Sequence, residues 1–325
     1  MITLEQAKIG MTNKVDQQVI ETFQKNSLMM DSLVFDDAVS PGTGGSTLGY
    51  SYILEKKPSK AGIRKLNEEY KPTVAEREEK STNAIILGGN YTIDRVLAGT
   101  SGAVDEVAYQ MEQKVKATAN EFTNLAINGK KTADNGQFDG LKTLLAGSDT
   151  EFTSTLDISD ETTIKENYQT VLDEVDAFLS EIIGTPDMLL MNKLMINKLR
   201  SVARRAGYYS QTKDDFGRVV DYYNGIPMQD AGKYYDGEKE VDIVPIEADG
   251  TSAIYTFKSE RDGFIGITPM GGKMITQRLP KFEEAGAVKE GDVEIIIGVA
   301  LKNSRKAGVL KGIKIKAIAS EEPSV

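Results

Sequence analysis

The chain has 325 residues, of which 40% are hydrophobic and 27% charged, and its net charge at neutral pH is −10. It contains no Cys, His or Trp. A disulfide framework is therefore excluded, and the usual zinc ligands, the commonest general base and the most reactive nucleophile are absent. The acidic balance also argues against a protein whose main task is to bind nucleic acid, which typically shows a basic surface.

The N-terminal sequence MITLEQAKIGMTNKVD has no basic stretch followed by an apolar run, so no signal peptide is predicted. The longest aliphatic runs, such as IIIGVAL (295–301), are far too short to cross a membrane. We therefore expect no membrane partner.

Residues 1–44 are predicted to form an arm rather than a domain. Short helices are expected over residues 3–8 and 15–25, and SLMMDSLVF (27–35) follows them. This apolar content is too small for a core of its own, so the arm needs another surface to lie against. SPGTGGS (40–46) predicts a flexible break, because the glycines lack the spacing and the strand-to-helix context of a dinucleotide-binding loop.

The segment EKKPSKAGIRKLNEEYKPTVAEREEK (55–80) is the most unusual stretch of the chain. Eight of its residues are Lys or Arg and six are Glu, and it is far longer than an ordinary connection of about 4 to 6 residues. Strand-like sequence flanks it: STLGYSYIL (46–54) and TNAIILGG (82–89). It predicts a projection that the protein's own fold does not cover.

From residue 101 the apolar residues recur at helical spacing, which predicts a long helix over 101–128. A second helix is expected over 159–183, a buried strand at PDMLLMN (186–192), and a third helix from Asn192 to Arg205 that ends at Gly207. Short β-prone runs punctuated by Gly, Pro and Asp then fill the rest. The predicted class is α+β.

Several motifs contain residue types that occur in chemical sites. DNGQFDG (134–140) does not have the spacing of an EF-hand loop, so it is interpreted as a turn. RSVARR (200–205) complements the dipole at a helix end, although contact with phosphate stays open. The Glu pairs at 68–69 and 78–79 are interpreted as solvated or intersubunit charges. No catalytic residue, cofactor-binding residue or metal ligand is predicted, and no cofactor.

The order of elements, together with local phrases, resembles the major capsid proteins of tailed bacteriophages. TLEQAKIG (3–10) and VIETFQKNSLMMDSLVF (19–35) are similar to the family's opening. NEEY (67–70) and ILGGNYTIDRVLAG (86–99) resemble the tip and the returning strand of its extended loop. FDGL (138–141), PDMLLMNKLMINKLRSVARR (186–205) and YYNGIPMQDAG (222–232) resemble later segments.

The resemblance implies the Hong Kong 97 capsid fold. The implied divisions are an N-terminal arm (1–44), an extended β-hairpin loop (45–92), a peripheral domain (93–186) with a spine helix at 101–128, an axial domain (187–277), and a return to the peripheral domain (278–325).

The implied function is a structural one without catalysis. The protein would self-assemble as pentamers and hexamers into the icosahedral head that encloses phage double-stranded DNA. It would assemble in the host bacterial cytoplasm and reside in the virion. Implied partners are further copies of the chain, a portal protein, packaged DNA held without sequence specificity and, because the arm begins at Met1, a separate scaffolding protein.

The resemblance also suggests where subunits meet. The candidate intersubunit residues are Lys56, Lys57, Arg64, Lys65, Glu68, Glu69, Lys71, Glu76, Arg77, Phe23 and Phe35. Some relatives crosslink Lys to Asn with the help of a Glu, but no matching Glu follows Asn303, so self-crosslinking is not expected. Two alternatives stay open: an encapsulin-like compartment shell, which shares the fold, and a carboxylate-based, metal-dependent hydrolase.

Overall fold

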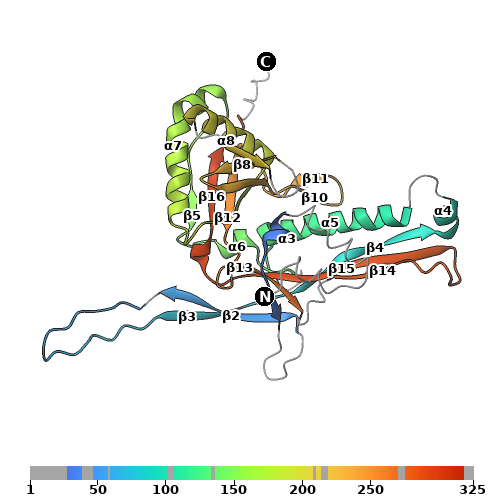
Figure 1. Cartoon of the computed structure of the whole chain (residues 1–325), viewed down its shortest axis with the longest axis horizontal. Coiled ribbons are helices and arrows are strands. Elements are labelled where there is room, and N and C mark those ends of the chain that lie inside the picture. Colours follow the sequence, from blue (N-terminus) through green and yellow to red (C-terminus); the bar gives the residue numbers. More distant parts are fainter. Residues whose placement is uncertain are drawn as a thin grey trace, which may run out of the picture.

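The computed structural model describes residues 28–38, 47–57, 59–100, 106–132, 136–207, 210–213, 219–269 and 275–317. The helices expected at 3–8 and 15–25 lie outside these ranges. The described residues form a long flat body, an upright body beside it, and a hairpin that projects from their junction (Figure 1). Helices and strands are mixed throughout, so the α+β prediction is confirmed.

The flat body is a five-stranded sheet beneath a long helix (Figure 1). The sheet runs in the order β1-β13-β15-β14, with β4 also paired to β15. Its strands are β1 (Phe35–Ala38), β4 (Ile85–Asp94), β13 (Phe264–Pro269), β14 (Ile275–Arg278) and β15 (Val288–Leu301).

The helix above this sheet is α5 (Glu106–Asn128). It confirms the expected long helix from residue 106 onward, and residues 101–105 lie outside the described ranges. Its apolar stripe, which includes Val115, Phe122 and Ala126, faces Val293, Ile295 and the other inward residues of β15 in one core cluster. Because every third or fourth residue of α5 is apolar, the helix buries one face against the flat sheet.

The upright body is a seven-stranded sheet in the order β5-β16-β12-β6-β9-β8-β7. Its strands are β5 (Glu151–Thr153), β6 (Met188–Met191), β7 (Ser210–Lys213), β8 (Val219–Tyr223), β9 (Ile226–Asp230), β12 (Thr251–Phe257) and β16 (Ala307–Lys314). Helices α7 (Glu161–Ser180) and α8 (Lys193–Ala206) cover one face of it and form a second core cluster with the sheet.

Local sequence explains where these two helices begin and end. Asp160 closes a capping box with Thr163 at the start of α7. Asn192 caps α8 by accepting a hydrogen bond from the Met195 amide, and Gly207 ends α8 in the left-handed conformation. The predicted cap and stop of α8 are therefore confirmed, whereas α7 is shorter than expected by a few residues.

The hairpin consists of β2 (Gly49–Lys57) and β3 (Glu76–Asn83), which form a separate two-stranded sheet. The expectation that ILGGNYTIDRVLAG is the returning strand is wrong. The return is made by β3 inside the charged segment, and β4 belongs to the flat sheet, where it pairs with β15. A ribbon with solvent on both faces needs no apolar alternation, so β3 carries no sequence signal of a strand.

The remaining elements are short. They are α3 (Leu28–Ser32), α4 (Arg95–Thr100), α6 (Leu141–Leu144), β10 (Lys233–Tyr235), β11 (Glu240–Asp242) and the 3₁₀ turn η1 (Ser304–Lys306). Of these, α4 occupies the end of the flat body farthest from the hairpin (Figure 1).

The packing differs from the expected division of the chain in both directions. β13 and most of β14, expected in the axial domain, belong to the five-stranded sheet. β5 and α7, expected with the spine helix, pack with the seven-stranded sheet, and so does β16. The reason is that the chain crosses between the two sheets in its second half. Residues 258–263 lead from β12 to β13, and residues 302–306 lead from β15 to β16. Lys258 N donates to Lys306 O at 2.8 Å and so joins these two crossings side by side.

Candidate functional site

The hairpin is the feature of this molecule that is hardest to explain as part of a self-contained fold. β2 and β3 pair in antiparallel register from Gly49–Asn83 to Lys57–Glu76, with an irregularity between Glu55 and Lys57. No third strand joins this ribbon within the described residues. Isolated two-stranded ribbons are marginally stable in water, so the hairpin depends on what holds its base and on what meets its tip.

The tip, residues 59–75, has no regular secondary structure, and nearly all of its side chains are exposed. It turns at Asn67, whose φ of 66° is in the left-handed region that Asn tolerates. A few internal contacts shape it: Thr73 Oγ1 donates to Lys60 O at 2.6 Å, and the Arg64 guanidinium lies 5.5 Å from the Tyr70 ring centroid. The tip is therefore a shaped but uncovered loop.

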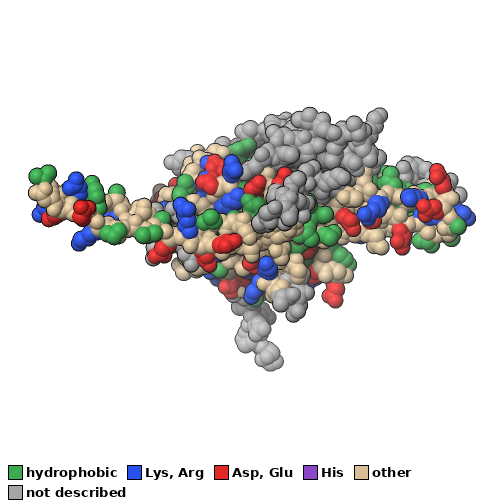
Figure 2. Space-filling model, turned by 90° about the horizontal axis from the view of Figure 1, so that it is seen from below, with side chains coloured by type: hydrophobic (Ala, Val, Ile, Leu, Met, Phe, Trp, Pro, Cys, Tyr) green, Lys and Arg blue, Asp and Glu red, His purple; other side chains and the backbone are tan. Residues whose placement is uncertain are grey.

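Most of the predicted intersubunit residues lie on this hairpin. The exposed ones on the tip are Arg64, Lys65, Glu68, Glu69 and Lys71, and those on β3 are Glu76 and Arg77. Lys56 and Lys57 end β2, where the described structure covers only the backbone. Figure 2 shows basic, acidic and hydrophobic side chains interspersed along the projection.

The two predicted phenylalanines have different outcomes. Phe23 lies outside the described residues. The expectation for Phe35 is corrected by its burial, because the side chain is only 3% exposed and belongs to the core cluster under α5. Its ring lies where a β-carbon on Gly266 would have to be. Phe35 thus anchors β1 within its own subunit and has no surface left for a neighbour.

The base of the hairpin is held by a polar contact that the sequence did not reveal. The Tyr50 hydroxyl on β2 donates to Asp36 Oδ2 on β1 at 2.6 Å. Lys302 Nζ reaches the same oxygen at 3.3 Å and lies 5.3 Å from the Tyr50 ring centroid. This Asp36–Tyr50–Lys302 cluster joins the hairpin, the edge strand of the flat sheet and the crossing after β15.

The electrostatics of this cluster follow from burial and pairing. Burial alone would raise the pKa of Asp36, but the Tyr50 hydrogen bond and the Lys302 ammonium outweigh it, so the pKa lies below its usual value. Burial, and then the hydrogen bond to Asp36, raise the pKa of Tyr50 far above its usual value. At neutral pH the hydroxyl is therefore a fixed donor to a charged carboxylate, which is a strong kind of hydrogen bond.

Tyr52, two residues along β2, supplies the apolar half of the anchor. It is buried in a small cluster with Ala38, Ile265, Ile267 and Ala300. Burial raises its pKa to about 12. Tyr50 and Tyr52 lie on the same face of the strand. Tyr50 contacts the polar Asp36–Lys302 pair, and Tyr52 packs into the apolar cluster.

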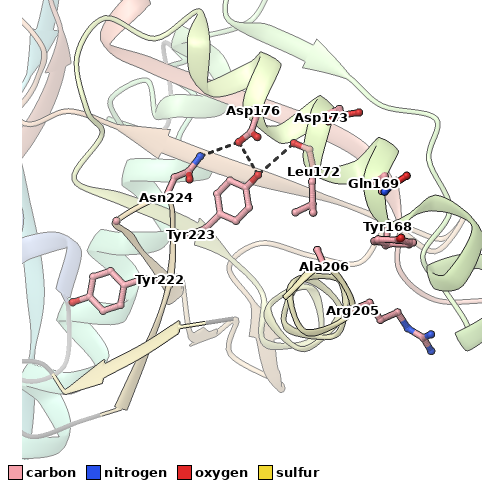
Figure 3. Close-up of a pocket in the computed structure, with 11 residues that line it drawn as sticks. Tyr168, Gln169, Leu172, Asp173, Asp176, Arg205, Ala206, Tyr222, Tyr223 and Asn224 are labelled. Atoms are coloured by element: carbon pink, nitrogen blue, oxygen red, sulfur yellow. Dashed lines mark hydrogen bonds between the residues drawn. The ribbon is translucent and has the colours of Figure 1, made fainter. Parts of the chain in front are cut away.

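A hollow in the described surface lies on the upright body, between α7, the end of α8 and the β8–β9 turn (Figure 3). Its volume is about 880 Å³. Asp176 in its wall accepts hydrogen bonds from the Tyr223 hydroxyl at 2.7 Å and from the Asn224 amide at 3.0 Å. This carboxylate is thus engaged in joining α7 to the β8–β9 turn.

The described residues were expected to hold no metal site, and the geometry of their carboxylates can be compared with that expectation. Among the described residues, no group of three or more Asp or Glu side chains converges in a way that could hold a metal ion. No helix in that part of the chain is long and apolar enough to cross a membrane.

Comparison with protein families gives a match over slightly less than half of the chain. Residues 78–232 match the model of the SU10 major capsid protein family. This range runs from β3 of the hairpin through α5 and α7 to the end of β9 in the upright sheet. No curated protein matches the chain.

Comparison with solved structures finds the same architecture repeatedly. The encapsulin of Synechococcus elongatus is 12% identical, with a TM-score of 0.56, over 89% of this chain and 88% of that one. A chain in the structure of Microbacterium phage Oxtober96 is 9% identical, with a TM-score of 0.55, over 90% of this chain and 91% of that one. The capsid of Myoviridae phage XM1 is 12% identical, with a TM-score of 0.51, over 84% and 89%.

At such low identity these structures establish the fold alone, and they do so along almost the whole chain. The family match adds the kind of protein, and it agrees with the resemblance of the sequence phrases. The chain therefore has the Hong Kong 97 fold, residues 78–232 match a major capsid protein family, and together these findings support a structural capsid role.

Proposed function

We propose that copies of this chain assemble as pentamers and hexamers into an icosahedral head that encloses double-stranded DNA. The observation that carries the proposal is the hairpin, a ribbon of 9- and 8-residue strands with an exposed tip that its own subunit leaves uncovered. Mixed charges on such a projection find partners across an interface, where they set register and specificity more than affinity.

We assign the parts of the fold accordingly. The hairpin is the extended loop that lies over a neighbouring subunit. The flat sheet with α5 as its spine is the peripheral domain. The upright sheet with α7 and α8 is the axial domain around the five- and six-fold positions. β5, α7 and β16 are assigned to it and not to the peripheral domain, whereas β13 is assigned to the peripheral domain and not to the axial one.

The proposed partners follow from this role. The shell would form in the host bacterial cytoplasm on a separate scaffolding protein, incorporate a portal protein, and become part of the virion. DNA inside would be held without sequence specificity. A net charge of −10 per chain suits that task, because an acidic wall repels phosphates and leaves the packaged DNA mobile.

The experiment that tests the proposal removes the tip and keeps the fold. In the variant, residues 58–75 are replaced by an Asn-Gly turn that connects Lys57 to Glu76. These two residues already face each other across the ribbon, so a two-residue turn can join them. We expect the isolated subunit to unfold at the same denaturant concentration as the wild type, because the tip makes no core. Electron microscopy of wild-type protein, co-expressed with its neighbouring genes, should show uniform shells, and the variant should show none.

Two results would contradict the proposal. Wild-type protein that stays a monomer or dimer under every condition would remove the shell role. Normal shells from the tipless variant would leave the shell role intact but remove the hairpin as its basis.

An encapsulin-like compartment is the second candidate, because the encapsulin of Synechococcus elongatus has the same fold. The contents of purified shells discriminate between the two. Nuclease-protected DNA supports a phage head, whereas a single co-purifying protein in place of DNA supports a compartment.

A further inference from the structure

Two exposed apolar patches occupy opposite ends of this elongated molecule. The first is on the hairpin tip, where Ile63, Leu66, Tyr70 and Val74 are all exposed, Leu66 to 88% and Val74 to 84%. We call these four side chains the tip patch. Burying an aliphatic side chain of this size is worth about 1.5 to 3 kcal/mol, so four of them together on one short loop point to an interface.

The second patch is at the α4 end of the flat body. Val96 and Leu97 on α4 are 63% and 61% exposed, and Val288 at the start of β15 is 58% exposed. These residues are neighbours, because Asp94 pairs with Val288 and the Arg95 amide donates to Ala287 O at 2.8 Å. Tyr109, in the first turn of α5, is a further exposed side chain near this end. We call Val96, Leu97 and Val288 the α4 patch.

The two patches cannot meet within one molecule. The tip and α4 lie at opposite ends of the longest axis (Figures 1 and 2). The hairpin is also held at its base by the Asp36–Tyr50–Lys302 cluster and by the burial of Tyr52. The tip patch of one molecule can therefore be covered only by another molecule, and the same holds for the α4 patch if the hairpin is to cover it.

The charges around the two patches are opposite in sign. Residues 59–75 carry four basic and two acidic side chains, whereas residues 278–294, beside the α4 patch, carry five acidic and three basic ones. All three of those basic side chains are engaged within their own segment. Arg278 pairs with Asp292 at 2.9 Å, Lys281 pairs with Glu284 at 3.4 Å, and Lys289 donates to the carbonyl oxygens of Glu284 and Ala285. Asp94 and the exposed Arg95 beside Val96 balance each other in charge, so an excess of two acidic side chains is what these segments present to a partner.

We infer that the tip patch of one copy docks on the α4 patch of a second copy, head to tail. The apolar side chains supply the buried area, and the basic tip faces the acidic segment 278–294. Such a contact joins two different surfaces of one chain, so it repeats from copy to copy and forms a ring where the rotation between copies closes. The inference rests on the proposed shell role and adds the surface that receives the hairpin.

The absence of Cys from the chain allows a direct test. One set of chains carries Ile63→Cys, Leu66→Cys or Val74→Cys, and a second set carries Val96→Cys, Leu97→Cys or Val288→Cys. Each tip chain is mixed with each α4 chain, assembled into shells and treated with a short bis-maleimide. We expect covalent mixed dimers from at least one combination, and none from either chain alone. Tyr235→Cys, an exposed position on β10 of the upright body, replaces the α4 partner as the matched control and should give no dimer.

A charge exchange tests the electrostatic part. Lys65→Glu with Lys71→Glu on the tip, or Glu283→Lys with Glu290→Lys beside the α4 patch, should each reduce shell yield about tenfold, which corresponds to about 1.4 kcal/mol. The four substitutions in one chain should restore the yield, because the complementary signs are then exchanged.

Shells without any tip–α4 crosslink, together with no rescue by the fourfold variant, would overturn the inference while the shell role stood. If the wild-type chain formed no shells at all, the proposed function itself would fail. The two failures are therefore distinguishable.

Discussion

The Tyr50 hydroxyl lies 2.6 Å from Asp36 Oδ2, and this single hydrogen bond joins the first strand of the hairpin to the edge strand of the flat sheet. Its donor and acceptor are 14 residues apart in the chain, and Lys302 completes the contact from the far end of the sequence. The angle at which the hairpin leaves the body is thus set by a contact outside the hairpin's own ladder.

Removing that bond should loosen the hairpin without unfolding the body. We expect Tyr50→Phe to lower the free energy of unfolding by about 1.5 to 3 kcal/mol, the usual net value for a hydrogen bond to a charged group. Amide hydrogen exchange should quicken in β2 and β3 and stay unchanged in α5. Tyr235→Phe, at an exposed tyrosine, is the control. Unchanged exchange in the hairpin of Tyr50→Phe would show that the ribbon needs no such anchor.

Gly266 on β13 should not tolerate a side chain. A β-carbon there would lie 2.3 Å from the Phe35 ring, so Gly266→Ala must displace either the ring or the strand. We expect a loss of about 1 to 3 kcal/mol in unfolding free energy, as for other overpacked cores, measured by urea denaturation of the unassembled subunit.

Gly62→Ala is the matched control for this substitution. Nothing lies within 4 Å of a β-carbon at Gly62 on the tip, so its effect should stay within about 0.5 kcal/mol. Adding Phe35→Leu to Gly266→Ala should recover part of the loss. Equal stability of the two alanine variants would contradict the packing described for Phe35.

Asn192 performs three tasks at once, so its loss should be costly. Its side chain accepts from the Met195 amide at 2.8 Å, and it donates to Val244 O at 3.2 Å and to Ser252 Oγ at 2.6 Å. Asn192→Ala removes a helix cap worth about 1 kcal/mol and leaves buried acceptors without their donor, at about 1 to 3 kcal/mol. We expect a total of about 2 to 4 kcal/mol.

Calorimetry or urea denaturation measures that loss. Asn192→Asp keeps the capping oxygen but loses both amide donations and buries a charge, so it should not restore stability. If Asn192→Asp were as stable as the wild type, the cap alone would account for the role of this residue.

The junction between the two sheets should depend on acid pH. Lys306, only 7% exposed, donates to Glu260 Oε2 at 2.7 Å and to Asp262 Oδ1 at 2.6 Å. Hydrogen bonds from Lys258 and Lys306 lower the pKa of Glu260, and the bond from Lys306 lowers that of Asp262. Burial lowers the pKa of Lys306, but Asp262 and Glu260 outweigh it, so its net pKa lies above 10.5.

The sign of the effect follows from these directions. Carboxylates with depressed pKa values contribute stability above their unfolded values of 4.5 and 3.8, and lose it as the pH falls below them. Lys306 contributes below 10.5 and loses its contribution as the pH rises through its raised value. We therefore expect the difference in unfolding free energy between the wild type and Lys306→Met to narrow from pH 7 to pH 3.

Asp187 lies near this junction, and burial raises its pKa. Its effect on stability therefore has the opposite sign, because its protonation as the pH falls removes the cost of burying its charge. The comparison of the wild type with Lys306→Met separates the effect of the Lys306 cluster from that of Asp187, because the wild type and the variant both retain Asp187. A difference that stayed constant between pH 7 and pH 3 would show that the cluster does not hold the two crossings together.

Much of the local structure could be predicted, and the reason is periodicity. α5 and α8 bury one stripe each, and the start and end of α8 follow from Asn192 and Gly207. β3 could not be predicted in the same way. Burial alternates along β3, with Glu78, Lys80 and Thr82 on its more covered face, but those positions hold polar or charged residues, so the sequence EREEKSTN shows no apolar alternation.

The candidate site was only half predictable. The charged tip was apparent from composition, because such a segment cannot be buried. The role of Phe35 was not, since an aromatic residue in an arm looks the same whether it packs against a neighbour or under its own spine helix.

By itself, the sequence determined the helices, the α+β class and the existence of a projection that the fold cannot cover, because all three depend on residues close together in the chain. Only the tertiary structure decided that Lys302 and Asp36, 266 residues apart, share one anchor, that β16 joins the upright sheet, and that two apolar patches lie at opposite ends. These features depend on where the chain crosses between two sheets, and the free energy that selects the crossings is spread over two whole cores.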